Sequence, residues 1–382
     1  MAKNIIFCAD GTWNSPDQDE NSDGCPDFTN VYKLFLALEG ADLPGTIRCA
    51  DEQEKESRGN GAAHQIAKYI HGVGDSRNPI VKLMGGAFGS GVISRIVRGY
   101  TFISRNYEPG ADIYIIGFSR GAYTARALGG LIASQGLLGP HLTHDKGLAY
   151  RCGAQAWYRY REAAKARSKT TFDRLLELAA DLPAFLSRGT LKPDEFIAVE
   201  RIQCVAVWDT VGSMGIPNYR QDARVDAFKF ADTRLSAKVQ HGFHAVALDE
   251  QRVDFTPTLW DATPNVAQLL FPGAHADVGG GYPTLDKQSG LSDQALQWMM
   301  QQMQGVGARF AERHADGLDP DAAGTAHKPW IHKPWPEFPV GSRRFADGIA
   351  EHASIAARVA AERVIAEPGE APTPYRPTNR VG

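Results

Sequence analysis

Short apolar blocks alternate with glycine-rich and polar turns along the chain, and this pattern predicts a succession of strands and helices. Residues 4–9, NIIFCA, form a compact apolar run that stops at an Asp-Gly pair, which is typical of a buried strand. Residues 29–40 predict a helix capped by Thr29 or Asn30. Residues 45–50, GTIRCA, predict a second strand.

The middle of the chain carries the clearest pattern. Apolar residues from Val92 to Tyr107 recur at helical spacing, and a Pro-Gly pair then ends the predicted helix. The run 112–116, DIYII, predicts a strand, and the residues after Ser119 predict a further helix. This alternation of helix and strand is the rhythm of a parallel sheet with helices on its faces.

The second half of the chain continues this rhythm after an interruption. Residues 140–200 have a helical pattern and predict an insertion or lid, with one helix over 155–169 and another over 171–189. Residues 201–215 begin as an apolar strand that ends at Asp209. Three further elements are expected: a helix over 242–250, a strand, glycine turn and polar loop over 267–282, and a helix capped by Ser292.

These elements predict one α/β catalytic domain over residues 1–310, with a mostly parallel sheet flanked by helices. Residues 311–382 are rich in Pro, His and Trp. They are expected to form a C-terminal extension packed on the same domain, with a short helix over 348–364 and a Pro-rich tail.

Composition narrows the class of protein. The net charge of −3 over 382 residues does not favour nucleic acid as a partner. The five cysteines form no Cys-x-x-Cys pair, which argues against a zinc ribbon or a disulfide framework, and Cys8 and Cys204 fall in apolar runs as expected for buried thiols. The N-terminal apolar run is too short for a signal peptide, so a cytoplasmic location is expected.

The pentapeptide GFSRG, residues 117–121, is a Gly-x-Ser-x-Gly motif at the junction of a predicted strand and helix. A serine on such a turn is exposed above the sheet, and Gly117 and Gly121 keep side chains away from the sharp bend. Ser119 is therefore the candidate nucleophile. The alternative is an ordinary serine that caps a helix.

A nucleophilic serine needs a histidine to accept its proton and a carboxylate to orient that histidine. Asp209 and His275 follow Ser119 in the order serine, acid, histidine, each at the end of a predicted strand. Asp249 and Asp254 also precede the histidine and remain alternatives for the acid.

The candidate oxyanion hole combines two backbone N–H groups. One belongs to Arg120, which follows the nucleophile, and the other is expected from Gly11 or Thr12 in the loop after the first strand. Asp10 is expected to fix that loop. Asp277 is expected to brace the glycine-rich loop after His275.

Two other functions remain open. FCADGTWN, residues 7–14, is similar to an aspartyl-phosphate motif but has Cys8 in place of the first aspartate. A metal-dependent phosphohydrolase would use ligands such as Asp10, Asp75, His275 and Asp277, and no metal site with clustered histidines is predicted. A non-catalytic, hydrolase-like lipid or protein binding module could use the basic and aromatic stretch at 158–169, whose simpler interpretation is a solvated helix face.

Several stretches together resemble an uncharacterised α/β-hydrolase domain family that includes the catalytic domain of type VI secretion phospholipase effectors. The matching stretches are FCADGTWN at 7–14, GGAFGSG at 85–91, NYEPGADIYIIGFSRGAYTARALGGLI at 106–132, CVAVWDTVGSMG at 204–215, HAVALDE at 244–250, PTLW at 257–260 and PGAHADVGGGY at 272–282.

This resemblance implies an α/β-hydrolase-like fold and a serine esterase or lipase in which Ser119, Asp209 and His275 form the triad. It implies ester or phospholipid substrates, no cofactor, and peripheral contact with a membrane. It also implies export by a type VI secretion system, with a secretion-apparatus or immunity protein as partner.

Overall fold

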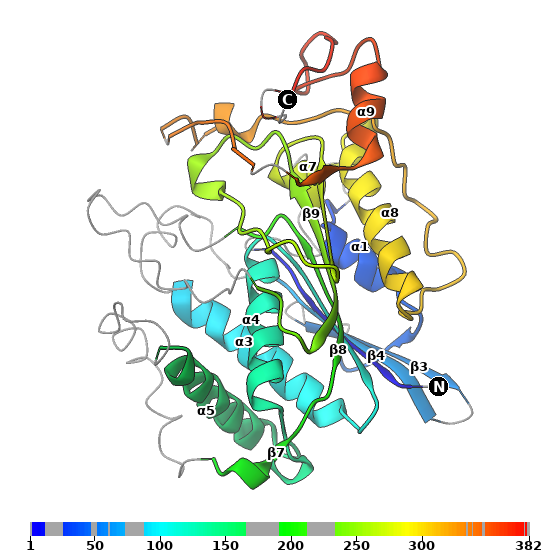
Figure 1. Cartoon of the computed structure of the whole chain (residues 1–382). Helices are drawn as coiled ribbons and strands as arrows, with labels where there is room; N and C mark the ends of the chain where they lie inside the picture. The colour runs from blue at the N-terminus through cyan, green and yellow to red at the C-terminus, as the bar shows by residue number, and fades with distance from the viewer. Residues whose placement is uncertain are drawn as a thin grey trace.

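The computed structural model describes residues 2–11, 26–46, 52–59, 62–72, 88–165, 191–211, 234–333, 335–337, 339–345, 348–377 and 379. Most of the strand expected at 45–50 and the whole helix expected at 171–189 lie outside these residues. Figure 1 shows helices on both faces of a central twisted sheet, with the C-terminal segment crossing one end of it.

Nine strands of the described residues form one sheet, in the order β11-β10-β9-β8-β5-β1-β4-β3-β2. They are β1 (Asn4–Ala9), β2 (Ala41–Asp42), β3 (Glu52–Gly59), β4 (Ala62–Ile70), β5 (Asp112–Phe118), β8 (Ile202–Trp208), β9 (Val239–Ala247), β10 (Val266–Phe271) and β11 (Ala350–Glu351). The pairings from β11 to β4 are parallel, whereas β3 and β2 pair antiparallel at one edge. Because β1, β5, β8 and β10 run in the same direction, their carboxyl ends meet at one end of the sheet.

Helices cover both faces of this sheet. On one face, α3 (Phe88–Asn106) and α4 (Arg120–Gln135) pack on the strands, and α5 (Lys146–Lys165) packs on these two helices. On the opposite face lie α1 (Asn30–Ala37) and α8 (Gly290–Gly305) (Figure 1). The short helices α7 (His275–Gly279) and α9 (Ala353–Ala360) lie near the carboxyl end of the strands, and β6 (Leu137–Leu138) pairs with β7 (Phe196–Ile197) apart from the main sheet.

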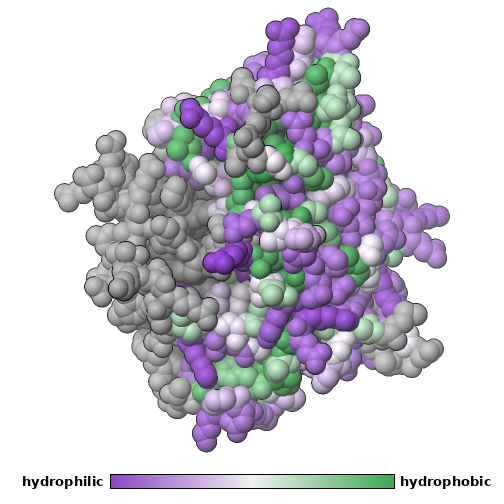
Figure 2. Space-filling view, in the orientation of Figure 1, coloured by the Kyte–Doolittle hydropathy of each residue, from purple (hydrophilic) through white to green (hydrophobic). Residues whose placement is uncertain are grey.

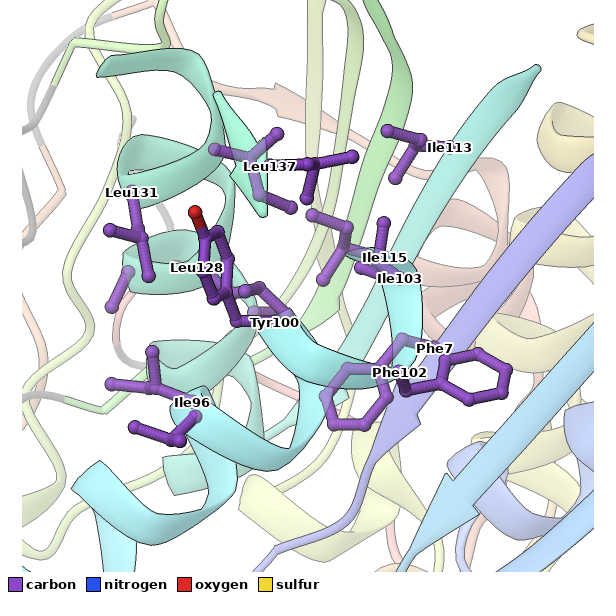
Figure 3. Packing of buried hydrophobic residues seen from close by; sticks show 14 of the residues in the cluster. Phe7, Ile96, Tyr100, Phe102, Ile103, Ile113, Ile115, Leu128, Leu131 and Leu137 are labelled. Atoms are coloured by element: carbon purple, nitrogen blue, oxygen red, sulfur yellow. The ribbon is translucent and has the colours of Figure 1, made fainter. Parts of the chain in front are cut away.

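The alternation of side chains along the central strands divides the core into two layers. Phe7 and Ile115 belong to the layer beneath α3 and α4, whereas the adjacent residues Cys8 and Ile116 belong to the layer beneath α1 and α8. Figure 3 shows the first layer, where Tyr100 packs between the strands and α4. Strands buried on both faces explain why their sequences are continuously apolar.

The fold is the predicted one, a mostly parallel sheet flanked by helices as in α/β-hydrolases. The strand at 4–9 and the helix capped by Thr29 are confirmed. The helix expected over 242–250 is wrong, because these residues belong largely to β9, a strand buried between β8 and β10. A buried parallel strand and a buried helix both read as apolar runs, so their sequence patterns are hard to distinguish.

Two smaller expectations near the site also differ from the structure. The polar loop expected after the glycine turn begins instead as the helix α7. Ser292 lies inside α8 rather than at its cap, and Ser289 occupies the cap position. The hydroxyl of Ser292 donates to the Ser289 carbonyl, so it bonds the backbone within the first turn.

Figure 2 shows hydrophilic and hydrophobic residues side by side on the coloured part of this face. Among the described residues, no helix is long and apolar enough to cross a bilayer. Cys8 and Cys204 are buried free thiols, as their apolar surroundings in the sequence predicted.

Candidate active site

Ser119 occupies a strained turn between β5 and α4. Its φ of 57° and ψ of −120° are unusual for a residue with a side chain. The turn requires glycine on both sides, because a Cβ at Gly117 would lie 2.2 Å from the Gly121 carbonyl oxygen and one at Gly121 would lie 2.0 Å from the Ala9 oxygen. This geometry has the features of a nucleophile elbow, a strained strand-to-helix turn that places the serine at the carboxyl end of the sheet, although Ser119 itself is buried, at 6% exposed.

Asp209 directly follows β8, the strand next to β5 in the sheet. Phe118 pairs with Trp208 in the β5–β8 register, and the Ser119 N–H donates to the Trp208 carbonyl at 3.1 Å. Asp209 therefore follows β8 where Ser119 follows β5. Its side chain is fully buried, and its φ of 34° is also positive.

His275 is the first residue of α7, after the carboxyl end of β10. Its Nδ1 lies 2.5 Å from Oδ2 of Asp209, and its ring contacts that of Phe118 with centroids 4.6 Å apart. The structure thus brings His275 to Asp209 and to the residue that precedes Ser119. With Nδ1 engaged by the carboxylate, Nε2 is the nitrogen left to accept a proton.

Electrostatics favour a neutral His275 beside an ionised Asp209. Burial lowers the pKa of His275, and this effect outweighs the hydrogen bond and negative charge of Asp209, which act to raise it. Burial alone would raise the pKa of Asp209, but the Arg343 cation and the bonds from His275 and Arg343 hold it well below its usual range. A neutral imidazole held by a carboxylate has the protonation state required of a general base.

Arg343, which the sequence pattern did not single out, is part of the same cluster. Its Nη1 donates to Oδ1 of Asp209 at 2.7 Å and its Nη2 to Oδ2 at 2.8 Å. It also donates to the carbonyls of Ala247 and Phe255. Arg343 comes from the irregular C-terminal segment, where no periodicity or motif marks it.

Glu250 and Arg252 form a second buried ion pair beside His275. Both Glu250 oxygens accept from the Arg252 guanidinium at 2.8–2.9 Å, and Oε2 also accepts from the His275 N–H at 3.1 Å. Burial would raise the pKa of Glu250, but Arg252 lowers it to about 2. The Arg252 guanidinium stacks on Phe255, whose ring in turn contacts that of His275. His275 is therefore held through both its ring and its backbone.

Asp277 binds the turn that carries His275. Its Oδ2 accepts from the Ala274 N–H at 2.8 Å, and its Oδ1 lies 2.7 Å from Nδ1 of His327. The ring of His327 stacks on Tyr282. These contacts make Asp277 a brace for the segment around α7, while the carboxylate on the His275 ring is that of Asp209.

Asp10 fixes the end of β1 next to the elbow. Its carboxylate accepts from the Thr29 and Tyr69 hydroxyls and from the Gly11 N–H, each at 2.7 Å. Burial raises its pKa to about 6, and the three hydrogen bonds oppose the shift. The Gly11 N–H is thus engaged by Asp10, and Thr12 lies outside the described residues.

The N–H of Arg120 is the other sequence-predicted oxyanion donor. Arg120 is the first residue of α4, so this N–H lies at the N-terminus of that helix. The positive end of the helix dipole favours negative charge at that place. Both donors of the oxyanion hole stay predictions.

The other two candidate functions would need a cluster of metal ligands or an exposed basic surface. No group of three or more His, Cys, Asp or Glu side chains there is placed to hold a metal ion. Of the basic stretch 158–169, residues 158–165 belong to α5 and the rest lie outside the description. Arg161 is buried near the Trp157 ring, whereas Arg159 is exposed and donates to the Leu191 carbonyl.

The mostly parallel sheet with a strained serine on the turn after β5 defines the α/β-hydrolase class of fold. Within that class, the chain belongs to the family described as "T6SS, Phospholipase effector Tle1-like, catalytic domain", whose model matches residues 3–302.

Three other proteins are similar to this chain in sequence or structure. An uncharacterized protein of Saccharomyces cerevisiae, YEL023C, is 29% identical over 268 residues, which is 70% of this chain and 34% of that protein. A crystal structure of an uncharacterized protein from Pseudomonas aeruginosa aligns with a TM-score of 0.45 at 17% identity, over 84% of this chain and 49% of the other. The structure of the Tle1 effector bound to the VgrG spike from the type 6 secretion system aligns with a TM-score of 0.37 at 17% identity, over 74% and 51%. The chain thus spans about a third to a half of the length of these proteins.

Proposed function

We propose that the chain is a serine hydrolase that cleaves carboxylic ester bonds of lipids or phospholipids through a triad of Ser119, His275 and Asp209. The observation that carries this proposal is the 2.5 Å contact between His275 and Asp209 beside the strained turn of Ser119. Membership of the phospholipase effector family supports a lipid ester as the substrate class.

The proposed reaction follows from the roles of these three side chains. Nε2 of His275 takes the proton from the Ser119 hydroxyl as the serine oxygen attacks the acyl carbonyl. Asp209 stabilises the imidazolium that forms, and the Arg120 N–H stabilises the oxyanion. Because the Gly11 N–H donates to Asp10, Thr12 is the candidate for the second donor. His275 then protonates the leaving alcohol, and water attack releases the fatty acid and regenerates the serine.

We further propose that residues 311–382 act with residues 1–310 as one catalytic unit. His327 and Arg343 of the C-terminal extension contact Asp277 and Asp209, the two carboxylates around α7. The family description also supports export by a type VI secretion system, with a secretion-apparatus or immunity protein as partner and a membrane surface as the place of action.

A substrate panel tests the proposed function. Purified protein is mixed with p-nitrophenyl esters of increasing acyl length and with phosphatidylcholine–phosphatidylglycerol vesicles, and the released nitrophenol or fatty acid is measured with and without EDTA. We expect release by the wild type that is insensitive to EDTA and absent from Ser119→Ala. Loss of activity in EDTA with restoration by a divalent metal would favour a metal-dependent hydrolase, and activity that persists in Ser119→Ala would exclude the triad.

A further inference from the structure

The acid of the candidate triad is held by a residue far along the chain and outside the range 3–302 matched by the family model. Residues 339–343, called the strap here, run alongside residues 251–253. The Gly341 N–H donates to the Gln251 carbonyl at 2.8 Å, and the Val253 N–H donates to the Pro339 carbonyl at 3.2 Å. This pairing brings Arg343 to the buried carboxylate of Asp209.

The Arg343 guanidinium binds the Asp209 carboxylate at two points. Both Asp209 oxygens accept from the two terminal nitrogens of the guanidinium, and both residues are buried. The planar guanidinium matches the carboxylate plane, so it fixes the orientation of the acid as well as its charge. Bonds to two backbone carbonyls fix the guanidinium in turn.

We propose that Arg343 is a positioning residue for the reaction, which orients the Asp209 carboxylate and balances its charge so that His275 stays neutral and ready to act as the base. This inference rests on the proposed function of Ser119, His275 and Asp209. It makes the strap a required part of the active site.

Removal of the Arg343 charge has a defined electrostatic consequence. Among the described residues, the charged groups that act on the Asp209–His275 pair are Arg343 from the strap and Glu250 and Arg252 from the segment after β9. His244 on β9 interacts electrostatically with Asp209, and Arg126 on α4 interacts with His244. Arg252 is already paired with Glu250, and burial keeps His244 neutral by lowering its pKa to about 3. Without Arg343 the buried negative charge of Asp209 is uncompensated, so the Asp209–His275 pair takes up a proton at a higher pH.

The test uses three single substitutions in the full chain: Arg343→Gln, Arg343→Lys, and Arg344→Gln as the control. Arg344 is the adjacent arginine and is exposed. For each protein, kcat and KM for a short-chain p-nitrophenyl ester are measured from pH 5 to 9. Rates are divided by the active-site concentration, which is titrated with a fluorophosphonate, so that misfolded protein does not lower kcat.

For Arg343→Gln we expect kcat per active site to fall by about 10²-fold with little change in KM, because a misplaced acid misorients the base. The acidic limb of the pH profile of kcat for this variant should move to higher pH by about one unit. For Arg343→Lys we expect a fall of roughly tenfold with the acidic limb near that of the wild type, because lysine keeps the charge but not the two-point contact. Arg344→Gln should match the wild type.

Folded Arg343→Gln with wild-type kcat and an unmoved acidic limb would overturn the inference. If Arg343 had a purely structural role, Arg343→Gln would lower the unfolding temperature and the fraction of protein that reacts with the fluorophosphonate. The kcat per active site and the acidic limb of the pH profile would stay unchanged. If Arg343→Gln does not fold, Arg343→Lys decides, since wild-type kcat in that variant would contradict the two-point positioning. Failure of the proposed function is distinguishable, because wild-type protein would then not react with the fluorophosphonate at Ser119.

Discussion

Nδ1 of His275 lies 2.5 Å from Oδ2 of Asp209, and the ring of the same histidine contacts Phe118, which directly precedes Ser119. Three segments that are distant in sequence therefore meet at the carboxyl end of the sheet.

Asp209→Asn should reduce kcat for ester hydrolysis by about 10⁴-fold, because an amide favours the wrong tautomer of the neighbouring imidazole. Steady-state kinetics with a soluble ester measures the loss, and circular dichroism monitors folding, since the substitution also leaves the buried Arg343 without its anionic partner. His241→Gln on β9 is the control substitution, and this variant should keep wild-type kcat. A loss of less than tenfold in folded Asp209→Asn would contradict the role of the acid.

The pH dependence of kcat/KM reports on the protonation of His275 in the free enzyme. Only the neutral imidazole can accept the serine proton, and burial lowers the pKa of His275. A lowered pKa extends the neutral form toward acid, so the acidic limb should lie below the ordinary histidine value of about 6.5. A pH–rate profile from pH 4.5 to 9 checks this, and a limb above pH 7 would argue against the buried, neutral histidine.

Gly121→Ala should destabilise the elbow and abolish activity. Its new Cβ would lie 2.0 Å from the Ala9 carbonyl oxygen, so β1 or α4 must move at a cost of at least ~2 kcal/mol. Gly305→Ala is the matched control, because that glycine ends α8 with no heavy atom within 4 Å of an added Cβ. The control should keep full activity and gain up to ~1 kcal/mol of stability in urea denaturation. Equal stabilities of the two variants would refute the close packing at the elbow.

Asp10 should make the folding stability depend on pH. Burial raises its pKa in the folded state to about 6, so its protonated form is favoured by folding. This contribution is present below the unfolded pKa and is lost as the pH rises through 6. Between pH 5 and 7 the wild type should therefore lose about 1 kcal/mol more stability than Asp10→Asn.

Urea denaturation of both proteins at the two pH values measures this difference. Asp194→Asn, at an exposed position, is the control and should follow the wild type. If Asp10→Asn and the wild type lose the same stability between pH 5 and 7, then Asp10 does not titrate in this range.

Local patterns predicted the elements that build the elbow. The sequence predicts the strands at 4–9 and 112–116 because each is a short apolar run that ends at turn residues. The helix before 112–116 is predicted by its helical spacing of apolar residues, and the helix after Ser119 by its place after the strand. The sequence does not predict the antiparallel hairpin of β3 and β4, since β3 reads EQEKESRG and a half-solvated strand near the edge of a sheet needs few apolar residues. The apolar run of β9 predicts a helix instead of a strand, because burial on both faces removes the alternation that marks a strand.

The candidate site was only partly predictable for a different reason. Ser119, Asp209 and His275 each follow the end of a strand, so the parallel topology alone brings them to the carboxyl end of the sheet. Arg343 lies 134 residues from Asp209 in a segment without regular structure, so only the tertiary fold brings the two together. Glu250 likewise acts through the His275 backbone N–H, a contact that no side-chain motif encodes.

The most direct measurement of the central claim is covalent labelling of Ser119. Wild-type protein, Ser119→Ala and His275→Ala are incubated with a fluorophosphonate probe at neutral pH, and the labelled peptide is identified by mass spectrometry. We predict one modified residue in the wild type, Ser119, with no label in Ser119→Ala and labelling slowed by at least ~10³-fold in His275→Ala. Labelling at another residue, or at an undiminished rate in Ser119→Ala, would contradict the account.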